Sequence, residues 1–143
     1  MRISTRGQYS LEALLYMALL PEGTLASTRS IAENTGLSDG YLEQLFIPLK
    51  KAGIVQAVRG AQGGYLPTRR IGDITVGDIL RAVEGSLKPV ACLSSGTCSA
   101  EHTCIIRHTW AQLYLEINAC IDSITLADLV KSYHMGNEGE YTI

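Results

Sequence analysis

The sequence predicts a mainly helical α+β fold: a winged helix-turn-helix domain followed by a long C-terminal dimerisation helix. Two short amphipathic segments, near residues 28–34 and 39–52, are joined by the tight turn T-G-L-S, which is typical of a helix-turn-helix. Two strand-like segments that flank a glycine-rich turn follow at residues 54–69 and predict a wing. A further apolar helical pattern, at residues 103–121, lies beyond this small domain.

Two helices are expected before the segment that would read DNA. Leucines recur at helical spacing from Gln8 to Leu20, and Pro21 ends that pattern. The second helix is expected over residues 28–34, because Ser27 stands in the position of an N-cap.

The third helix is expected over residues 39–52. Pro48 lies inside it and removes one backbone hydrogen bond, so we expect the later turns to bend or loosen. In a helix-turn-helix this helix enters the major groove of DNA, and its first turns reach the base edges. The candidate base-reading residues are Ser38, Gly40, Tyr41, Glu43 and Gln44.

The side chains of this helix match known contacts to bases and phosphates. Gln44 is suited to a two-point hydrogen bond with adenine, and Glu43 to accepting one from a cytosine amine. Tyr41 is suited to a phosphate or to the methyl group of thymine. An ordinary solvent-facing helix would have similar residues, so the assignment depends on the helix-turn-helix.

The wing is expected to form from strands at residues 54–58 and 65–69. Arg59 and Gly60 lie at its tip, and an arginine on a slim turn fits a narrow minor groove. Four basic side chains are candidates for phosphate contacts: Arg2, Arg6, Lys50 and Lys51. Such contacts would make the affinity for DNA strongly dependent on salt.

Three helical segments are expected after the wing. The first begins at Thr75, which forms a capping box with Asp78. The long helix at residues 103–121 carries a wide apolar face, and pairing with its copy in a second subunit is the simplest way to bury that face. A short helix is expected over residues 126–133. Cys120, on the long helix, is interpreted as a small buried residue.

The chain is expected to divide into four segments. These are a winged helix-turn-helix region at residues 1–85, a cysteine-rich cluster-binding loop at 86–103, the dimerisation helix with the short helix at 104–135, and a flexible tail at 136–143. The first 70 residues carry eight Lys or Arg against five Asp or Glu, whereas the other residues carry four against nine. A basic first half suits contact with a polyanion.

The hydropathy pattern and the motifs of the sequence predict a cytoplasmic protein. No apolar run approaches the roughly 18–20 residues of a membrane span, and no signal-peptide pattern is present. Four cysteines in such a chain favour metal or redox chemistry over a disulfide scaffold, because cytosolic thiols are kept reduced. No nucleophile–base pair or phosphate-binding motif indicates an enzyme, so an enzyme is not expected.

Three of the cysteines form a regular series. Cys92, Cys98 and Cys104 have five residues between neighbours, in a stretch of mostly small and polar residues. Thiolates select zinc, copper(I) or iron–sulfur clusters. Structural zinc sites usually have gaps of about two to four residues, and the wider gaps here suit a loop around a larger body such as a cluster. The spacing alone leaves zinc, a cluster and redox-active thiols open.

Five stretches of the chain form a specific combination. They are M-R-I-S-T-R-G-Q-Y-S, L-S-D-G-Y-L-E-Q-L, V-R-G-A-Q-G-G-Y, T-V-G-D-I-L-R-A-V-E-G and the C-x5-C-x5-C loop. Along nearly the whole chain they resemble the Rrf2 family of transcription regulators. The resemblance implies a homodimer that binds a double-stranded DNA operator and carries one iron–sulfur cluster per subunit, held by Cys92, Cys98 and Cys104. Operator affinity would respond to the state of the cluster, for which 2Fe-2S is favoured over 4Fe-4S.

The fourth cluster ligand stays open. One branch of the family has a histidine three residues after the third cysteine, where this chain has Arg107. A nitric-oxide-sensing branch uses an acidic residue of the partner subunit at a position that corresponds to Gln8. The remaining candidates are His108, Glu12, His102 and an exogenous group. A zinc- or thiol-redox-controlled regulator on the same scaffold is the alternative function.

Overall fold

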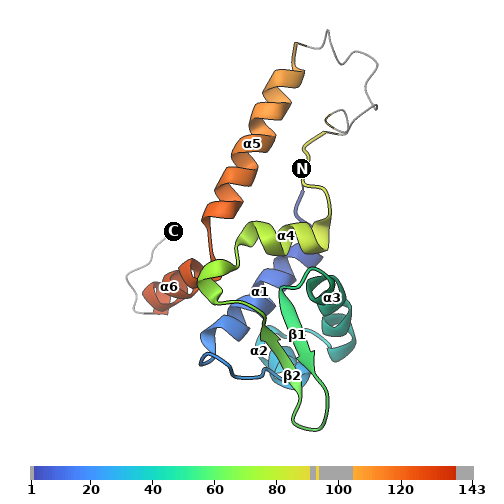
Figure 1. Cartoon of the computed structure of the whole chain (residues 1–143), viewed down its shortest axis with the longest axis vertical. Coiled ribbons are helices and arrows are strands. Elements are labelled where there is room, and N and C mark those ends of the chain that lie inside the picture. Colours follow the sequence, from blue (N-terminus) through green and yellow to red (C-terminus); the bar gives the residue numbers. More distant parts are fainter. Residues whose placement is uncertain (1, 91–92, 94–104, 138–143) are drawn as a thin grey trace.

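The described part of the chain contains six α-helices, one short 3₁₀-helix and a two-stranded sheet (Figure 1). The structure, a computed structural model, describes residues 2–90, 93 and 105–137. In chain order the elements are α1 (Thr5–Leu19), α2 (Thr28–Thr35), α3 (Asp39–Lys51), β1 (Val55–Val58), β2 (Gly64–Pro67), η1 (Ile71–Asp73), α4 (Val76–Glu84), α5 (Arg107–Ser123) and α6 (Leu126–Asn137).

Helices α2 and α3 form the predicted helix-turn-helix, and each begins at a serine cap. Ser27 Oγ accepts a hydrogen bond from Ser30 N at 3.0 Å, and Ser38 Oγ accepts one from Tyr41 N at 3.2 Å. Gly36 ends α2 with a φ of 75°, a left-handed conformation that favours glycine. Local signals in the sequence therefore set the bounds of both helices.

The wing consists of β1 and β2, which pair antiparallel up to Val58 opposite Gly64. Ala26, just before α2, pairs with the second strand: Ala26 N donates to Tyr65 O and Tyr65 N donates to Ala26 O, both at 2.8 Å. A Cβ at Gly64 would lie 2.4 Å from the carbonyl oxygen of Ala26, so this close approach requires glycine. The wing is thus joined to the start of the helix-turn-helix.

Two helices begin at other residues than predicted. α1 begins at Thr5 rather than at Gln8, because Ser4 provides an N-cap before the apolar pattern starts. α5 begins at Arg107, and a turn containing Ile106 precedes it. The predicted first residues of that helix, 103 and 104, lie outside the described residues.

Pro48 does not interrupt α3. The helix continues to Lys51 and closes with a hydrogen bond from Ala52 N to Pro48 O at 2.9 Å. The expected loosening of the later turns is therefore wrong, and a bend at Pro48 stays a prediction. Phe46 and Leu49, on either side of the proline, are fully buried, and their packing holds turns that lack one backbone hydrogen bond.

One apolar core joins the helix-turn-helix, the wing, α4 and α6. Its largest fully buried members include Leu14, Ile31, Leu42, Leu45, Phe46, Ile54, Ile79 and Leu126. Leu126 begins α6, so the C-terminal helix packs back on α1 and η1. We call the assembly of α1–α4, the wing and α6 the head.

Phe46→Ala is expected to lower the free energy of unfolding by about 3–5 kcal/mol. The ring of Phe46 is fully buried and stacks on Tyr65 with ring centroids 4.2 Å apart, so its removal leaves a cavity between α3 and β2. Urea denaturation measures the change. Ile47→Ala is the matched control, because Ile47 is 52% exposed; its effect should stay within about 0.5 kcal/mol. Equal losses would contradict this account of the core.

Helix α5 projects away from the head, and we call it the arm (Figure 1). None of its residues is buried, and it packs mainly on α4. Several of its large apolar side chains face solvent, among them Leu113 at 42% and Leu115 at 63% exposure. Within residues 2–90, 93 and 105–137, no helix is both long enough and apolar enough to cross a membrane.

Candidate DNA-binding surface and cysteine segment

Helix α3 has one buried face and one exposed face. Leu42, Leu45, Phe46 and Leu49 are buried in the core. Gly40, Glu43, Gln44 and Ile47 are exposed and recur at three- and four-residue spacing, which places them together on the opposite face. The structure therefore brings three of the predicted base-reading residues onto one surface.

Ser38 and Tyr41 are placed differently from the other candidates. The hydroxyl oxygen of Ser38 accepts the capping hydrogen bond of α3, and its own proton can still be donated to DNA. The ring of Tyr41 is half-buried and meets Tyr9 of α1 edge to face, with centroids 6.0 Å apart. Tyr41 thus positions α3 on α1 as well as being a candidate contact to DNA.

Tyr65 of the wing connects the two DNA-reading elements. It stacks on Phe46 of α3 with planes 12° apart. Burial, and next the nearby charge of Glu43, raise the pKa of Tyr65 above its ordinary value. The phenol therefore stays uncharged at neutral pH and adds no negative charge to a surface that would face phosphates.

The tip of the wing is a tight turn between β1 and β2. Arg59 and Gly60 are exposed there, and Gly60 has a φ of 116°. Gly63 N donates to Gly60 O at 3.0 Å, and a Cβ at Gly63 would lie 2.0 Å from Val58 O. Glycine at these positions keeps the turn slim, as insertion of Arg59 into a narrow groove requires.

A hollow of about 370 Å³ lies between the wing, the start of α2 and the end of α3. Lys50, Arg59 and Thr28 are among its lining residues. Two cations and a hydroxyl around one hollow suit a phosphate of the DNA backbone. The candidate contacts from Lys50 and Arg59 therefore meet at one place.

The N-terminal arginines do not lie at this hollow. The N-terminus and the wing are on opposite sides of the head (Figure 1), so no contact in the structure supports Arg2 as a DNA-binding residue, which stays a prediction. Arg6 Nη2 donates to Val83 O at 2.8 Å. That guanidinium links α1 to α4. Spacing in the sequence does not reveal the carbonyl oxygen of Val83 as its partner.

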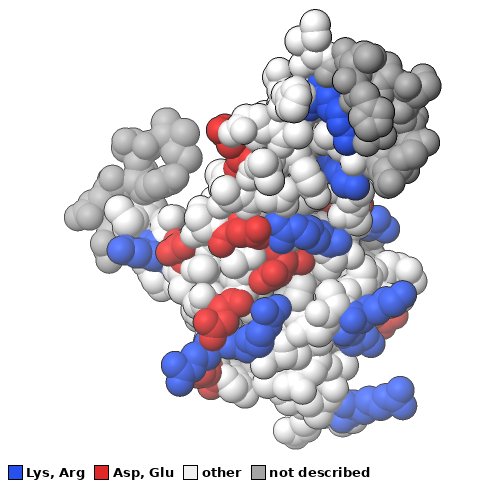
Figure 2. Space-filling model, turned by 45° about the horizontal axis from the view of Figure 1, so that its top comes forward, with Lys and Arg blue, Asp and Glu red and all other residues white. Residues whose placement is uncertain are grey.

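Charge is mixed on the face of the molecule that Figure 2 draws. Figure 2 shows acidic and basic side chains next to one another across the middle of the face that it draws. Ion pairs such as Arg69 with Asp78, at 3.8 Å, have the same mixed character. The middle of that face therefore offers no continuous basic surface.

Arg59→Ala is expected to weaken DNA binding about tenfold or more and to reduce the slope of log affinity against log salt by about 1. Arg59→Lys should keep the slope but lose preference for sites with a narrow A·T minor groove. Fluorescence anisotropy at several salt concentrations measures both quantities. Lys131→Ala on α6 is the control, because Lys131 is exposed and lies outside the α3–wing surface, by which we mean the exposed face of α3 together with the wing. A change in slope for Lys131→Ala equal to that for Arg59→Ala would contradict the assignment.

The predicted cluster ligands Cys92, Cys98, Cys104 and His102 lie outside the described residues. Within the part that the structure describes, no group of three or more His, Cys, Asp or Glu is placed to hold a metal ion. The other two candidates are both exposed: His108 on the first turn of α5 and Glu12 on α1. The ligand set therefore stays a prediction.

Cys120 is exposed, so its interpretation as a buried residue is wrong for the single chain. The apolar face of the long helix was expected to be covered by its copy in a second subunit, which a single chain does not contain. α5 is covered mainly by α4, and Cys120 lies on a face that α4 does not reach.

Glu84, the last residue of α4, is a structural residue that the sequence did not indicate. Its Oε1 accepts hydrogen bonds from Ser4 N, at 3.0 Å, and from Ser4 Oγ. A Cβ at Gly7 would lie 2.4 Å from that same oxygen. The start of α1 is therefore fastened to the end of α4, directly before the cysteine segment. The two residues are 80 positions apart, so no local pattern could reveal the contact.

Comparisons with known proteins agree with the architecture. The family model Rrf2, "Iron-dependent Transcriptional regulator", matches residues 3–132. The HTH-type transcriptional regulator IscR of Citrobacter koseri is 36% identical over 132 residues, which cover 92% of this chain and 81% of that protein. A solved structure of IscR from T. potens has a TM-score of 0.74 and 39% identity, and the match covers 100% of this chain and 93% of that one.

A second kind of regulator is also similar. The structure of CymR, described as the global cysteine regulator of B. subtilis, has a TM-score of 0.75 and 36% identity, over 92% of this chain and 97% of that one. The relatives are transcription regulators rather than enzymes, and the predicted winged-helix fold is confirmed. The exposed face of α3 and the wing stay the predicted DNA-binding surface, and the chain belongs to the Rrf2 family of transcription regulators.

Proposed function

We propose that the protein is a homodimeric transcription regulator whose affinity for a double-stranded DNA operator depends on an iron–sulfur cluster. The observation that carries the proposal is the series Cys92, Cys98 and Cys104, which lies between two connected parts of the molecule. In the sequence, the segment that contains these cysteines follows α4 and precedes α5. A group bound by them would therefore be connected along the chain to both the head and the arm.

The donor set fits an iron–sulfur cluster. Three thiolates are soft ligands, which select clusters, zinc or copper(I) over hard cations. His108, in the first turn of α5, lies four residues after Cys104 in the sequence and is exposed. Glu12, His102 and an exogenous group remain the other candidates for the fourth position. A bound cluster would supply a redox-active charge, and 2Fe-2S stays the favoured type. The description of the matching family model as iron-dependent supports iron at this site.

Homodimer formation through α5 is supported by the spacing of its apolar residues. Ile106, Trp110, Leu113, Ile117 and Cys120 follow one another in alternating steps of four and three residues, and we call this series the α5 stripe. All five are exposed or half-buried. This is the period at which two helices pack side by side as in a coiled coil. A second copy of α5 is the simplest partner for it.

A route from the cysteine segment to DNA would run through α4. This helix contacts α1, α3 and α5, and Glu84 at its end holds the start of α1. A change in the segment would shift α4 and with it the orientation of the DNA-reading elements. Couplings between two such sites are typically about 1–3 kcal/mol, or 5- to 150-fold in affinity.

The experiment is a comparison of holo and cluster-free protein. Full-length protein is purified anaerobically, its iron and sulfide are counted per chain, and its visible charge-transfer bands are recorded. Operators are selected from a random double-stranded DNA library, and both forms are titrated at one salt concentration. Equal affinities would exclude the cluster switch while leaving DNA binding intact.

A thiol- or zinc-controlled regulator on the same scaffold is the second candidate. It is favoured by the similarity to CymR, a protein described as a cysteine regulator. A colourless anaerobic preparation with one zinc per chain, or with thiols that oxidise reversibly and change operator affinity, would support it.

A further inference from the structure

Helix α5 is fastened to the head near its C-terminal end. Val76 N donates to Ile124 O at 2.8 Å, and Leu126 N donates to Ile74 O at 2.9 Å, so the link after α5 runs antiparallel to the link before α4. The Thr75–Asp78 capping box holds the start of α4 beside this joint. The rest of the arm extends away from the head (Figure 1).

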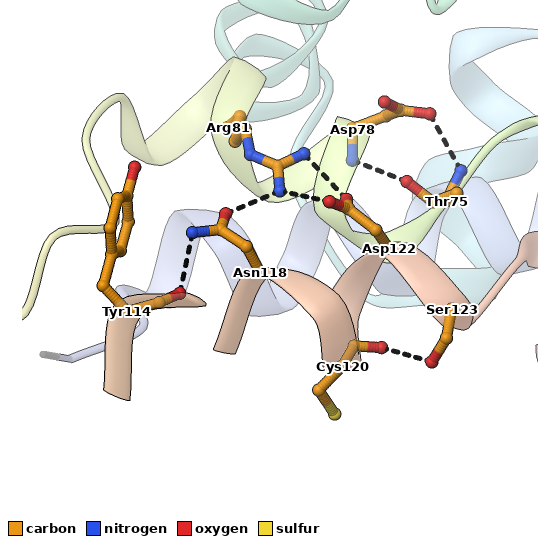
Figure 3. Close-up of polar contacts among 8 residues, drawn as sticks. All are labelled: Thr75, Asp78, Arg81, Tyr114, Asn118, Cys120, Asp122 and Ser123. Atoms are coloured by element: carbon orange, nitrogen blue, oxygen red, sulfur yellow. Dashed lines mark hydrogen bonds and ion pairs between the residues drawn. The ribbon is translucent and has the colours of Figure 1, made fainter. Parts of the chain in front are cut away.

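One side-chain cluster bridges α4 and α5 next to this joint (Figure 3). Arg81 Nη1 and Nη2 donate to the two carboxylate oxygens of Asp122, both at 2.8 Å. Nη2 also donates to Asn118 Oδ1 at 2.7 Å, and Asn118 Nδ2 donates to Tyr114 O at 2.8 Å. We call Arg81, Asn118 and Asp122 the arm clamp. A planar guanidinium in a two-point pair fixes direction as well as distance.

Gly77 makes room for the arm clamp. It is the second residue of α4, is buried, and lies one helical turn before Arg81. A Cβ at this position would lie 2.0 Å from Asp122 Oδ1 and 2.9 Å from Arg81 Nη1. The close approach of Asp122 to α4 therefore requires glycine at this position.

The arm clamp is suited to orienting α5 rather than to stabilising the fold. The side chains of Arg81 and Asp122 are 37% and 44% exposed, and exposed ion pairs contribute little to stability. The hydrogen bond with Asp122 raises the pKa of Arg81 above its ordinary value, against the opposing effect of burial. The guanidinium therefore keeps its charge at every pH near neutrality.

We propose that the arm clamp sets the angle between the arm and the head and so determines which spacing of operator half-sites the dimer accepts. This inference rests on the proposed homodimer through α5. A helix of 17 residues is about 25 Å long, so a rotation of about 8° at its base displaces its far end by about 3.5 Å, roughly the rise of one base pair. Arg81 is then a positioning residue that touches no DNA.

Two variants perturb the clamp by independent means. Arg81→Lys keeps the charge but loses the two-point geometry. Gly77→Ala keeps every charge and favours the helix, but displaces the carboxylate of Asp122. Gly72→Ala is the matched control, because a Cβ at Gly72 would have nothing within 4 Å. Full-length wild type and the three variants are each used to select binding sites from a random double-stranded DNA library, with oligomeric state measured by sedimentation equilibrium.

Wild type and Gly72→Ala are expected to select the same single half-site spacing. Arg81→Lys and Gly77→Ala should select a shifted or broadened spacing and bind the wild-type operator about tenfold or more weakly. Their dimer dissociation constants and their affinities for an isolated half-site should change less than about twofold. A misfolded variant would instead lose both dimer formation and half-site binding. Folded clamp variants that select the wild-type spacing with wild-type affinity would overturn the inference alone. A monomeric wild type would overturn it together with the proposed homodimer.

Discussion

Leu113→Glu is expected to convert the proposed homodimer into monomers and to abolish binding to an operator with two half-sites. Leu113 is in the middle of the α5 stripe and 42% exposed in the single chain. In the paired helices each subunit would bury one carboxylate among apolar side chains. Burying two unpaired charges costs about 4 kcal/mol or more, which is about a thousandfold in the dimer dissociation constant.

Leu115→Glu is the matched control for this variant. Leu115 is 63% exposed, more than Leu113, and lies about 200° further around the helix. The same substitution there should leave both dimer and operator binding unchanged. Sedimentation equilibrium and anisotropy titrations measure the two properties, and thermal unfolding checks that both variants are folded. Equal dissociation by the two substitutions would remove the α5 stripe as the interface.

Much of the head could be predicted because its signals are local. Serine and threonine caps stand within three residues of the amides they accept from, as at Ser27, Ser38 and Thr75. The glycines of the wing occur where the backbone makes a tight turn. Hydrophobic spacing then assigns the buried faces of α1 and α3. These features need no knowledge of distant residues, so the winged helix-turn-helix follows from the sequence.

The contacts that join the elements could not be predicted in the same way. Arg6 was expected to face a phosphate, yet its partner is a carbonyl oxygen 77 residues later. Glu84 and Arg81 have partners 80 and 41 residues away. Such pairs depend on how the helices pack, and that packing cannot be inferred from the spacing of residues in one sequence. The same limit explains Cys120, whose exposure depends on which face of α5 meets α4.

The placement of the base-reading residues could be predicted in part. Helical spacing correctly places Gly40, Glu43 and Gln44 on one exposed face of α3. The edge-to-face contact of Tyr41 with Tyr9 is a tertiary contact, and only the structure reveals that this candidate also packs against α1. That Lys50 and Arg59 line the same hollow is likewise apparent only in the folded structure.

Cys98→Ala is expected to remove the proposed cluster and with it the difference in operator affinity between holo and cluster-free protein. Cys98 is the middle member of the series, and the loss of one thiolate leaves two protein ligands among the three cysteines. The holo-to-apo affinity ratio, expected to be about 5- to 150-fold in the wild type, should fall to about one. Iron and sulfide counts per chain should fall in parallel with it.

Cys120→Ala is the thiol control for Cys98→Ala, because it removes a fourth thiol at the opposite end of α5 from the cysteine segment. Cys120 belongs to the α5 stripe, so the dimer dissociation constant of this variant is measured alongside its iron content. This variant should keep its iron, its visible absorption and its response to cluster removal. If Cys120→Ala alone abolished the response, a thiol on the arm would be the sensor. If Cys98→Ala kept both iron and response, the series would not be the ligand set. Retention of zinc by the wild type and its loss in Cys98→Ala would instead identify the alternative regulator, since thiolates at these positions would still be the ligands.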